Sequence, residues 1–298
     1  MAKRHPVKPD CNDGCTGLFW GDMLVLRLCT IGLVVTACAS THSSSESARA
    51  AAERERAASI SLDHVTLAPG TSHVSVQVDG GSRELLLRVP KGDMGNPRPL
   101  VVFLHGASGA NSLDRLAECL LEPGLAPVQP VILAPVSASP RWWVGSDARF
   151  VLGLVDAAVQ KWPLQANRVV VVGYSDGGIG AWSFIRLYPE VFSAAIPIAS
   201  SPSIMGASSR PVHAIHGQRD ELFAIGAVQQ EVDLLQREGS DVTLTVNAQG
   251  THFDACGYAA ELRSAAKWLV ESAWTRRAKK KRPREPTAPP MMHGFSGP

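Results

Sequence analysis

The sequence is poor in cysteine and in charge, which removes several classes of protein at the outset. Four of its six cysteines lie within the first 38 residues, so Cys119 and Cys256 alone remain for a folded region. They allow a single disulfide at most, or a pair of buried free thiols, and their spacing is not that of a zinc site. Charged residues make up 19% of the chain and apolar residues 45%. A disulfide framework is thus excluded, and so is a chain that is disordered throughout.

Long apolar runs are missing as well. Residues 28–37 form a run of ten, too short to span a bilayer but of the length of a signal-peptide core. The run ends in the letters VTAC, which resemble a bacterial lipobox, in which the cysteine is lipidated and becomes the mature N-terminus. We therefore expect residues 1–38 to be a signal peptide that starts at Met1 or at Met23, with Cys38 as the membrane anchor of an exported protein of the bacterial cell envelope. A plain secretory signal with a chance cysteine is the alternative.

Two polar segments enclose the part of the chain that is expected to fold. Residues 39–60 are small, polar and charged without an apolar stripe, which predicts a flexible linker. Residues 275–298 are rich in proline and carry a net charge of +6, which predicts a disordered basic tail. Such a tail is either a solvated extension or a contact to anionic lipid or nucleic acid, and no nucleic-acid-binding motif accompanies it. A single domain over residues 61–274 remains.

Within this domain the hydrophobic pattern alternates between strands and helices. Two segments with period-two alternation enclose Asp-Gly-Gly-Ser, which predicts an antiparallel hairpin over residues 73–89. Short continuous apolar runs follow, as expected for strands buried on both faces of a parallel sheet; they span residues 100–104, 131–134, 169–172, 194–198 and 212–215. Helical spacing separates them, and an amphipathic helix over residues 258–274 closes the domain. This order predicts an open α/β sheet.

The pentapeptide Gly173-Tyr174-Ser175-Asp176-Gly177 has the form G-x-S-x-G. The motif alone is weak, but here it directly follows four valines and opens a predicted helix. In that strand–turn–helix context the glycines admit a tight turn that lifts the serine above the sheet. We therefore predict that Ser175 is a nucleophile and that the backbone N–H of Asp176 donates to the oxyanion of the transition state.

A serine hydroxyl needs a base to activate it, and the base needs a carboxylate to orient it. Asp220 and His252 each follow a predicted strand, and the chain order of serine, acid and histidine is that of one known fold. We predict His252 as the base and Asp220 as the orienting acid. His216 is the weaker candidate for the base, and Glu221 and Asp254 compete for the acid.

Two further segments are expected at the site. The loop that begins at His105 follows a predicted strand, where a second N–H must face the oxyanion; Ala107 is the predicted donor, and His105 is expected to shape the loop. Trp142 and Trp143 follow another predicted strand and either wall a substrate pocket or serve as packing residues. The sequence shows no metal-ligand spacing, and neither a metal nor a cofactor is expected.

In their order, the segments FLHGASG, NRVVVVGYSDGG, IPIAS, IHGQRD and GTHFD resemble the α/β-hydrolase superfamily. The resemblance is nearest to its phospholipase/carboxylesterase and feruloyl esterase/polyhydroxybutyrate depolymerase-like branch, and it covers about residues 85–274. It departs at Ala107 and Ser108, where that branch has paired glycines. The resemblance implies a mostly parallel sheet with helices on both faces. It also implies a serine esterase that works through an acyl-enzyme, with Ser175 as nucleophile, His252 as base and Asp220 as orienter.

The spacing of the motifs limits what covers the site. Ser175 and Asp220 are 45 positions apart, and that interval must hold a helix and two strands, so we expect no large lid domain. An open site suits short acyl groups or an ester carried on a polymer. A serine peptidase or a thioesterase would use the same machinery, and a non-catalytic surface lipoprotein with this fold is a third interpretation. Substrate identity and oligomeric state do not follow from the sequence.

Overall fold

The computed structural model describes residues 47–92, 94–139, 141–202 and 206–275. The predicted signal peptide with Cys38, and the basic tail from residue 276 onward, therefore lie outside the described residues. Across the described ranges the strands form a nine-stranded sheet in the order β1-β2-β3-β5-β4-β6-β7-β8-β9. Their bounds are β1 (Ile60–Ser61), β2 (Gly70–Val78), β3 (Gly81–Val89), β4 (Arg98–Leu104), β5 (Val131–Pro135), β6 (Leu164–Tyr174), β7 (Ala194–Ile198), β8 (Val212–Gly217) and β9 (Val242–Asn247).

The sheet begins with the predicted hairpin. β2 and β3 pair antiparallel along their full length, from Gly70 opposite Val89 to Val78 opposite Gly81. The two turn residues, Asp79 and Gly80, have φ angles of 44° and 85°. Positive φ at both positions is the geometry of the two-residue turns whose twist matches that of the strands, and Asp-Gly favours it. The hairpin predicted from the alternating pattern is confirmed.

From β5 onward the neighbouring strands run parallel, as the continuous apolar runs predicted. β6 lies between β4 and β7, near the centre of the sheet. Because parallel strands point the same way, the carboxyl ends of β4, β6, β8 and β9 meet at one edge. The loop of Ala107, the turn of Ser175, and the loops of Asp220 and His252 follow these four strands in that order. The topology therefore gathers the predicted site at this edge.

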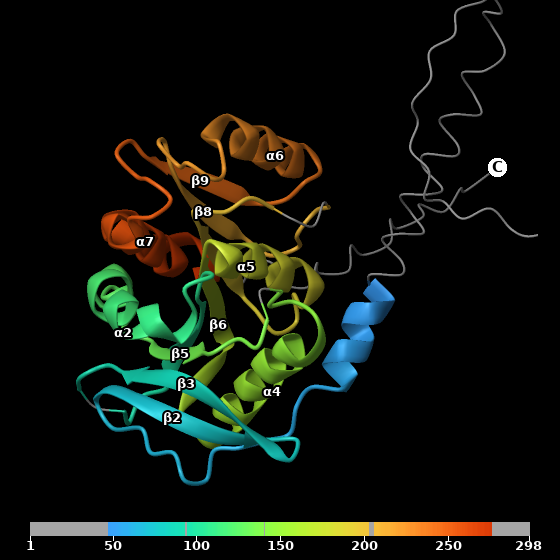
Figure 1. The fold of residues 1–298 in the computed structure, drawn as a ribbon, viewed down its shortest axis with the longest axis vertical. Helices are drawn as coiled ribbons and strands as arrows, with labels where there is room; N and C mark the ends of the chain where they lie inside the picture. Colours follow the sequence, from blue (N-terminus) through green and yellow to red (C-terminus); the bar gives the residue numbers. More distant parts are fainter. Residues whose placement is uncertain (1–46, 93, 140, 203–205, 276–298) are drawn as a thin grey trace, which may run out of the picture. The chain divides into compact units, whose positions relative to one another are not determined.

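Helices cover both faces of the sheet, with α4 and α5 on one side and α2 and α7 on the other (Figure 1). Their bounds are α2 (Leu113–Leu116), α3 (Glu122–Leu125), α4 (Gly145–Lys161), α5 (Asp176–Leu187), α6 (Ile225–Arg237) and α7 (Ala259–Trp268), with shorter helical turns η1 (Gly109–Ser112), η2 (Ala117–Leu121), η3 (Ala255–Tyr258) and η4 (Leu269–Ala273). None of the helices in the described ranges is both long and apolar enough to cross a bilayer.

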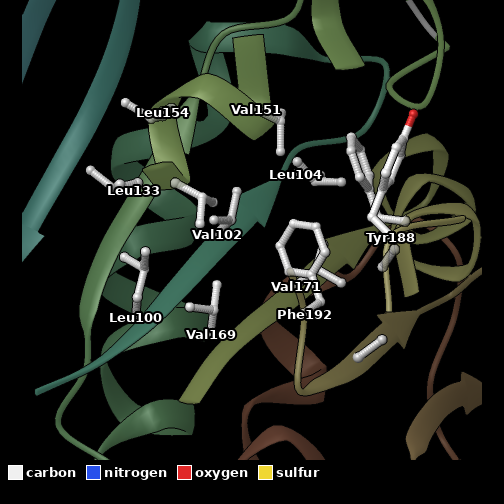
Figure 2. Close-up of a cluster of buried hydrophobic side chains, with 14 of the residues drawn as sticks. Leu100, Val102, Leu104, Leu133, Val151, Leu154, Val169, Val171, Tyr188 and Phe192 are labelled. Carbon is white, nitrogen blue, oxygen red and sulfur yellow. The ribbon is translucent and has the colours of Figure 1, made fainter. Parts of the chain in front are cut away.

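Strand β4 shows why this sheet needs helices on both faces. Leu100, Val102 and Leu104 point into one core, shared with α4, α5 and α6 (Figure 2). Val101 and Phe103 point into the other core, shared with η2 and α7. All five side chains have no solvent exposure. Burying an aliphatic or aromatic side chain of this size contributes about 1.5–3 kcal/mol to the stability of the fold. Several such side chains stabilise the packing of helices on each face of the sheet.

The N-terminal boundary of the domain differs from the one predicted. Residues 47–55, placed in the flexible linker by their polar composition, form a helix. Arg54 donates to both carboxylate oxygens of Asp156 at 2.5 and 2.9 Å, and Arg149 donates to Glu53 at 3.2 Å. These two ion pairs attach the helix to α4, and because they are formed by charged side chains they leave no apolar stripe in the sequence. The folded domain therefore includes residues 47–55, which lie before the boundary predicted at residue 61.

Candidate active site

Ser175 occupies the turn between β6 and α5, and its backbone conformation is unusual. Its φ of 56° and ψ of −119° lie in a region that residues with a side chain rarely adopt. The backbone N–H of Ser175 donates to the carbonyl of Ile198 on β7 at 3.0 Å, which ties the turn to the neighbouring strand. The turn directs the serine side chain away from the sheet, as predicted for the G-x-S-x-G motif.

The two outer glycines of the motif are required by the close approach of backbones. A Cβ on Gly173 would lie 1.9 Å from the carbonyl oxygen of Gly177, and a Cβ on Gly177 would lie 1.9 Å from that of Leu104. Real Cβ atoms do not come so near to backbone oxygen. The start of α5 therefore packs directly on the ends of β6 and β4, and this packing holds the strained turn in place.

Ser175, His252 and Asp220 form a continuous hydrogen-bonded relay. The Oγ of Ser175 lies 2.9 Å from Nε2 of His252, and Nδ1 of His252 lies 3.1 and 3.0 Å from Oδ1 and Oδ2 of Asp220. The side chains of Asp220 and His252 are 0% and 4% exposed. The structure thus brings the three predicted residues together, with the serine hydroxyl at one ring nitrogen of His252 and the carboxylate at the other.

The loop that carries Asp220 is fixed by its own hydrogen bonds. Oδ1 of Asp220 accepts the backbone N–H groups of Leu222 at 2.9 Å and Phe223 at 2.8 Å. His216, the weaker candidate for the base, has Nε2 at 2.8 Å from the carbonyl of Phe223 and 3.7 Å from Oδ2 of Asp220. It therefore braces the acid loop, and His252 is the histidine that reaches the serine.

Three side chains hold the loop that carries His252. The hydroxyl of Tyr174 donates to the carbonyl of His252, and that of Tyr258 donates to the carbonyl of Thr251 at 2.9 Å. The backbone N–H of His252 donates to Glu221 at 2.6 Å. Burial raises the pKa of Tyr174 to about 12 and also raises the pKa of Tyr258. Both hydroxyls therefore keep their protons, and remain donors, across the neutral pH range.

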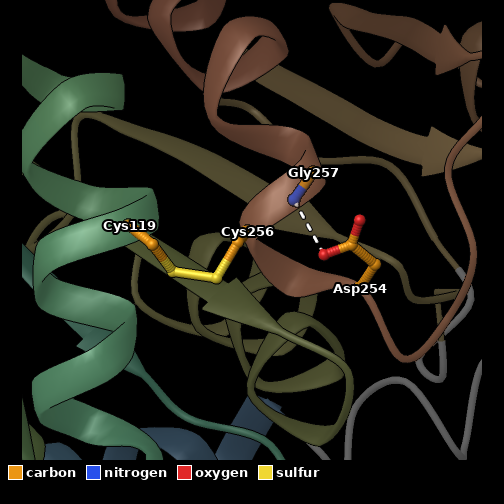
Figure 3. Close-up of a disulfide and its surroundings, with 4 residues drawn as sticks. All are labelled: Cys119, Asp254, Cys256 and Gly257. Carbon is orange, nitrogen blue, oxygen red and sulfur yellow. Dashed lines mark hydrogen bonds between the residues drawn. A yellow bond between two sulfur atoms is a disulfide. The ribbon is translucent and has the colours of Figure 1, made fainter.

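A disulfide between Cys119 on η2 and Cys256 on η3 clamps the same loop (Figure 3). The Cα atoms are 5.3 Å apart although the residues are 137 positions apart in sequence. Of the two alternatives left open by the sequence, the structure has the disulfide. Nearby, Asp254 accepts the backbone N–H of Gly257 at 3.2 Å, as drawn in Figure 3. Asp254 thus caps η3, and it is Asp220 that contacts the histidine ring.

The two predicted oxyanion donors belong to segments that meet at Ser175. Asp176 is the first residue of α5, where backbone N–H groups have no acceptor within the helix. Ala107 lines the same cavity as Ser175. A Cβ on Gly106 would lie 3.1 Å from Cβ of Ser175, so the backbone of this loop passes very close to the serine. The donor roles of Ala107 and Asp176 stay predictions, which this placement favours.

The tryptophan pair does not wall the cavity, which corrects one of the two interpretations offered by the sequence. Trp142 is 1% exposed and belongs to the core, where its indole N–H donates to the carbonyl of His105 at 3.1 Å. Trp143 is partly buried and packs against the same core. A buried indole N–H needs an acceptor, and the carbonyl of His105 at the start of the Ala107 loop supplies it. Trp142 therefore holds this loop in place.

Ser175 and His252 open into a cavity of about 400 Å³. Its other described lining residues are Gly106, Ala107, Ser108, Ser112, Arg115, Leu116, Tyr174, Leu222, Phe253, Ala255 and Cys256. Leu222 and Phe253 lie at the rim of this cavity, where they are 59% and 74% exposed. Such exposure is unusual for large apolar side chains and shows that the described residues do not cover the rim. The described residues contain no cluster of His, Cys, Asp and Glu that could hold a metal ion.

Comparison with solved structures finds proteins of the same fold. A thermostable esterase matches with a TM-score of 0.55 and 25% identity, and the match covers 67% of this chain and 62% of that one. The chain thus spans less than two thirds of the length of this neighbour. FphF, a fluorophosphonate-binding serine hydrolase of Staphylococcus aureus, matches at 0.58 with 15% identity, over 69% of this chain and 100% of that one. Est1E from Butyrivibrio proteoclasticus matches at 0.52 with 16% identity, over 68% and 99%. No family model and no curated protein matches the sequence.

The mostly parallel sheet, the helices on both faces and these structural neighbours define an α/β-hydrolase fold. The fold class and the superfamily resemblance drawn from the motifs are therefore confirmed, and the described residues contain no large lid domain. The finer placement in the carboxylesterase and depolymerase-like branch stays a prediction.

Proposed function

We propose that this protein is a serine hydrolase that cleaves carboxylic esters through an acyl-enzyme intermediate. The observation that carries the proposal is the relay from Ser175 through His252 to Asp220, with 2.9 Å between Oγ and Nε2, at the wall of an open cavity. The side chains of His252 and Asp220 are buried, so the interaction between them is shielded from water. A serine held in this way is activated for attack on an acyl carbon.

The first half of the reaction forms the acyl-enzyme. Oγ of Ser175 attacks the ester carbonyl carbon while Nε2 of His252 takes the hydroxyl proton, and Asp220 stabilises the imidazolium through Nδ1. The carbonyl oxygen becomes an oxyanion that accepts from the backbone N–H groups of Asp176 and Ala107. The carbon–oxygen bond to the alcohol then breaks, and His252 passes its proton to the departing alcohol.

The second half returns the enzyme to its starting state. A water molecule gives a proton to Nε2 of His252 and attacks the acyl carbon, which forms a second oxyanion in the same position. The bond to Oγ breaks, Ser175 regains its proton from His252, and the carboxylic acid leaves. The open rim at Leu222 and Phe253 lets water reach this carbon without a lid movement.

The proposal is supported by the structural neighbours, which include a thermostable esterase and a fluorophosphonate-binding serine hydrolase. A short panel tests it: an ester, a thioester and an amide that share one acyl group, each measured as kcat/KM. We expect the highest kcat/KM for the ester. A preference for the amide would indicate a peptidase and a preference for the thioester a thioesterase, while turnover of none of them would indicate a binding protein.

We also propose that the protein is exported and anchored by lipid at Cys38. The disulfide between Cys119 and Cys256 supports export, since such bonds persist in oxidising compartments such as the bacterial periplasm and cell surface. The test is membrane fractionation of the full chain and of Cys38→Ser. Membrane-bound wild type and a released or unprocessed variant are expected, and soluble wild type with a free, unlipidated N-terminus would falsify the anchor.

A further inference from the structure

One wall of the catalytic cavity is polar and contains a single permanent charge. Three of its residues are Ser108, which precedes η1, Ser112 at the end of η1, and Arg115 on α2. They follow one another at intervals of four and three residues, so they share one side of that helical segment. Oγ of Ser108 donates to Oγ of Ser112, which donates to the carbonyl of Gly109 at 3.0 Å. The two hydroxyls are thus partnered within the wall, and the guanidinium of Arg115 is its charged group.

The charge of Arg115 is not neutralised within the part of the chain that the structure describes. Arg115 is exposed and has no ion-pair partner among those residues. Its sequence neighbour Asp114 is engaged elsewhere, with Oδ1 at 2.9 Å from Nε2 of His73 on β2. No described residue lining the cavity is an aspartate or a glutamate. An anion in the cavity would therefore meet a free guanidinium.

The backbone that carries Arg115 is firmly held. Leu113 and Leu116, on either side of it, are 2% and 4% exposed and pack into the core beneath α7. The same helical segment continues into η2, where Cys119 forms the disulfide with Cys256. The guanidinium thus extends from a fixed point beside the cavity, so a ligand need not order the chain in order to reach it.

Another part of the wall is apolar, formed by Leu116, Leu222, Phe253 and Ala255. We propose that Arg115 determines specificity by binding a carboxylate on the substrate, so that the preferred esters have an apolar segment and a second, anionic end. Arginine suits a carboxylate because its planar fork donates two parallel hydrogen bonds. The inference rests on the proposed ester hydrolysis and adds to it the class of substrate.

The experiment compares two aryl esters of equal length, the 4-nitrophenyl monoester of adipic acid and its terminal carboxamide, which is neutral and nearly isosteric. Each is measured with wild type, Arg115→Gln, Arg115→Lys and Arg263→Gln. Arg263 is a matched control, because it is an exposed arginine on α7 that donates to the carbonyl of Pro123 and does not line the cavity.

We expect wild type and Arg263→Gln to prefer the carboxylate ester by about tenfold or more in kcat/KM, as for a charge-assisted hydrogen bond. Arg115→Gln should lose that preference through a higher KM, keep its rate on the carboxamide ester, and show less dependence on ionic strength. Arg115→Lys should fall between them. Equal rates of wild type on the two esters, or an unchanged preference in Arg115→Gln, overturn the role of Arg115. Failure to hydrolyse either ester contradicts the proposed function itself.

Discussion

The backbone N–H of His252 donates to the carboxylate of Glu221 at 2.6 Å, while the ring of His252 is bound by Asp220. Two consecutive acidic residues therefore hold one histidine, the first by its imidazole and the second by its backbone. Glu221, which competed with Asp220 for the acid in the sequence, is in this position a positioning residue: it does not touch the reacting atoms, but it fixes the chain from which the base extends.

The first prediction follows from that contact. Glu221→Ala should lower kcat by about tenfold with little change in KM, because a hydrogen bond to a charged group is worth about 1.5–3 kcal/mol and its loss loosens the base. Glu221→Gln keeps an acceptor oxygen and should recover part of the rate. Steady-state kinetics on one short-chain ester measures both. Wild-type kcat in the alanine variant would show that the contact is irrelevant to catalysis.

A second prediction concerns the disulfide. Replacing Cys119 and Cys256 together by serine frees a loop of 137 positions in the unfolded chain and should reduce the free energy of unfolding by about 2–5 kcal/mol. Chemical unfolding of the double variant, beside wild type with and without reductant, measures this. Reduced wild type should match the double variant. Equal stability of the oxidised wild type and the double variant would mean that the two cysteines are not bonded in solution.

The third prediction concerns the stability of the fold in acid. His213 is 6% exposed, with Nε2 at 2.8 Å from Oγ1 of Thr245 and its ring 5.1 Å from that of Trp268. Burial lowers the pKa of His213 from 6.5 to about 4. The unfolded chain therefore takes up the proton more readily than the folded one, so the stability is complete above pH 6.5 and falls as the pH falls toward 4.

Over the range from pH 7 to pH 4.5 the expected loss is about 2.5 kcal/mol, most of the free energy that corresponds to such a shift in pKa. It is measured as the difference in the free energy of unfolding between pH 7 and pH 4.5. His213→Gln, which keeps a side chain able to bond Thr245 but cannot titrate, should lack most of this difference. The same acid sensitivity in the variant would place its origin in other groups.

A fourth prediction follows from the open rim. Because Leu222 and Phe253 are exposed at the cavity and the described residues contain no lid domain, no apolar cover has to be displaced by aggregated substrate. The rate on a short-chain ester should rise smoothly and saturate as its concentration passes the solubility limit. Long acyl chains should be poorer substrates, since apolar surface left in water forfeits about 25 cal/mol per Å². A jump in rate at the limit, with a preference for long chains, would point to a cover.

Much of this fold could be predicted from the sequence because its pattern is local. Continuous apolar runs such as Val169 to Val172 predict strands buried on both faces, and Asp79-Gly80 predicts the turn between β2 and β3. The bounds of the helical segment from α2 to α3 could not be predicted, since Pro123 and Gly124 within it resemble loop residues. The helix of residues 47–55 was missed because charged contacts hold it to the domain.

The triad could be predicted as well, because each member directly follows a strand and the order of the three is set by the topology. The surroundings could not. Tyr258 and Thr251 are close in sequence, but nothing in the sequence says that a hydroxyl meets a carbonyl there. Arg115 lies on a segment without a recognised motif, and only the packing of α2 brings it to the cavity. The sequence could not decide between the two roles of Trp142, because a buried aromatic side chain and one that lines a pocket give the same sequence pattern.

The proposed role of Ser175 as the nucleophile of an ester hydrolase is tested by measuring the hydrolysis of a short-chain aryl ester by Ser175→Ala. We expect kcat to fall by several orders of magnitude while the fold and its thermal unfolding are retained, because triad members act as a unit. Ser183→Ala is the matched control, because Ser183 lies on α5, the helix that follows Ser175, and its hydroxyl donates to the carbonyl of Ile179 at 2.9 Å without contacting His252. Its activity should be nearly unchanged. Undiminished turnover in Ser175→Ala would contradict the account.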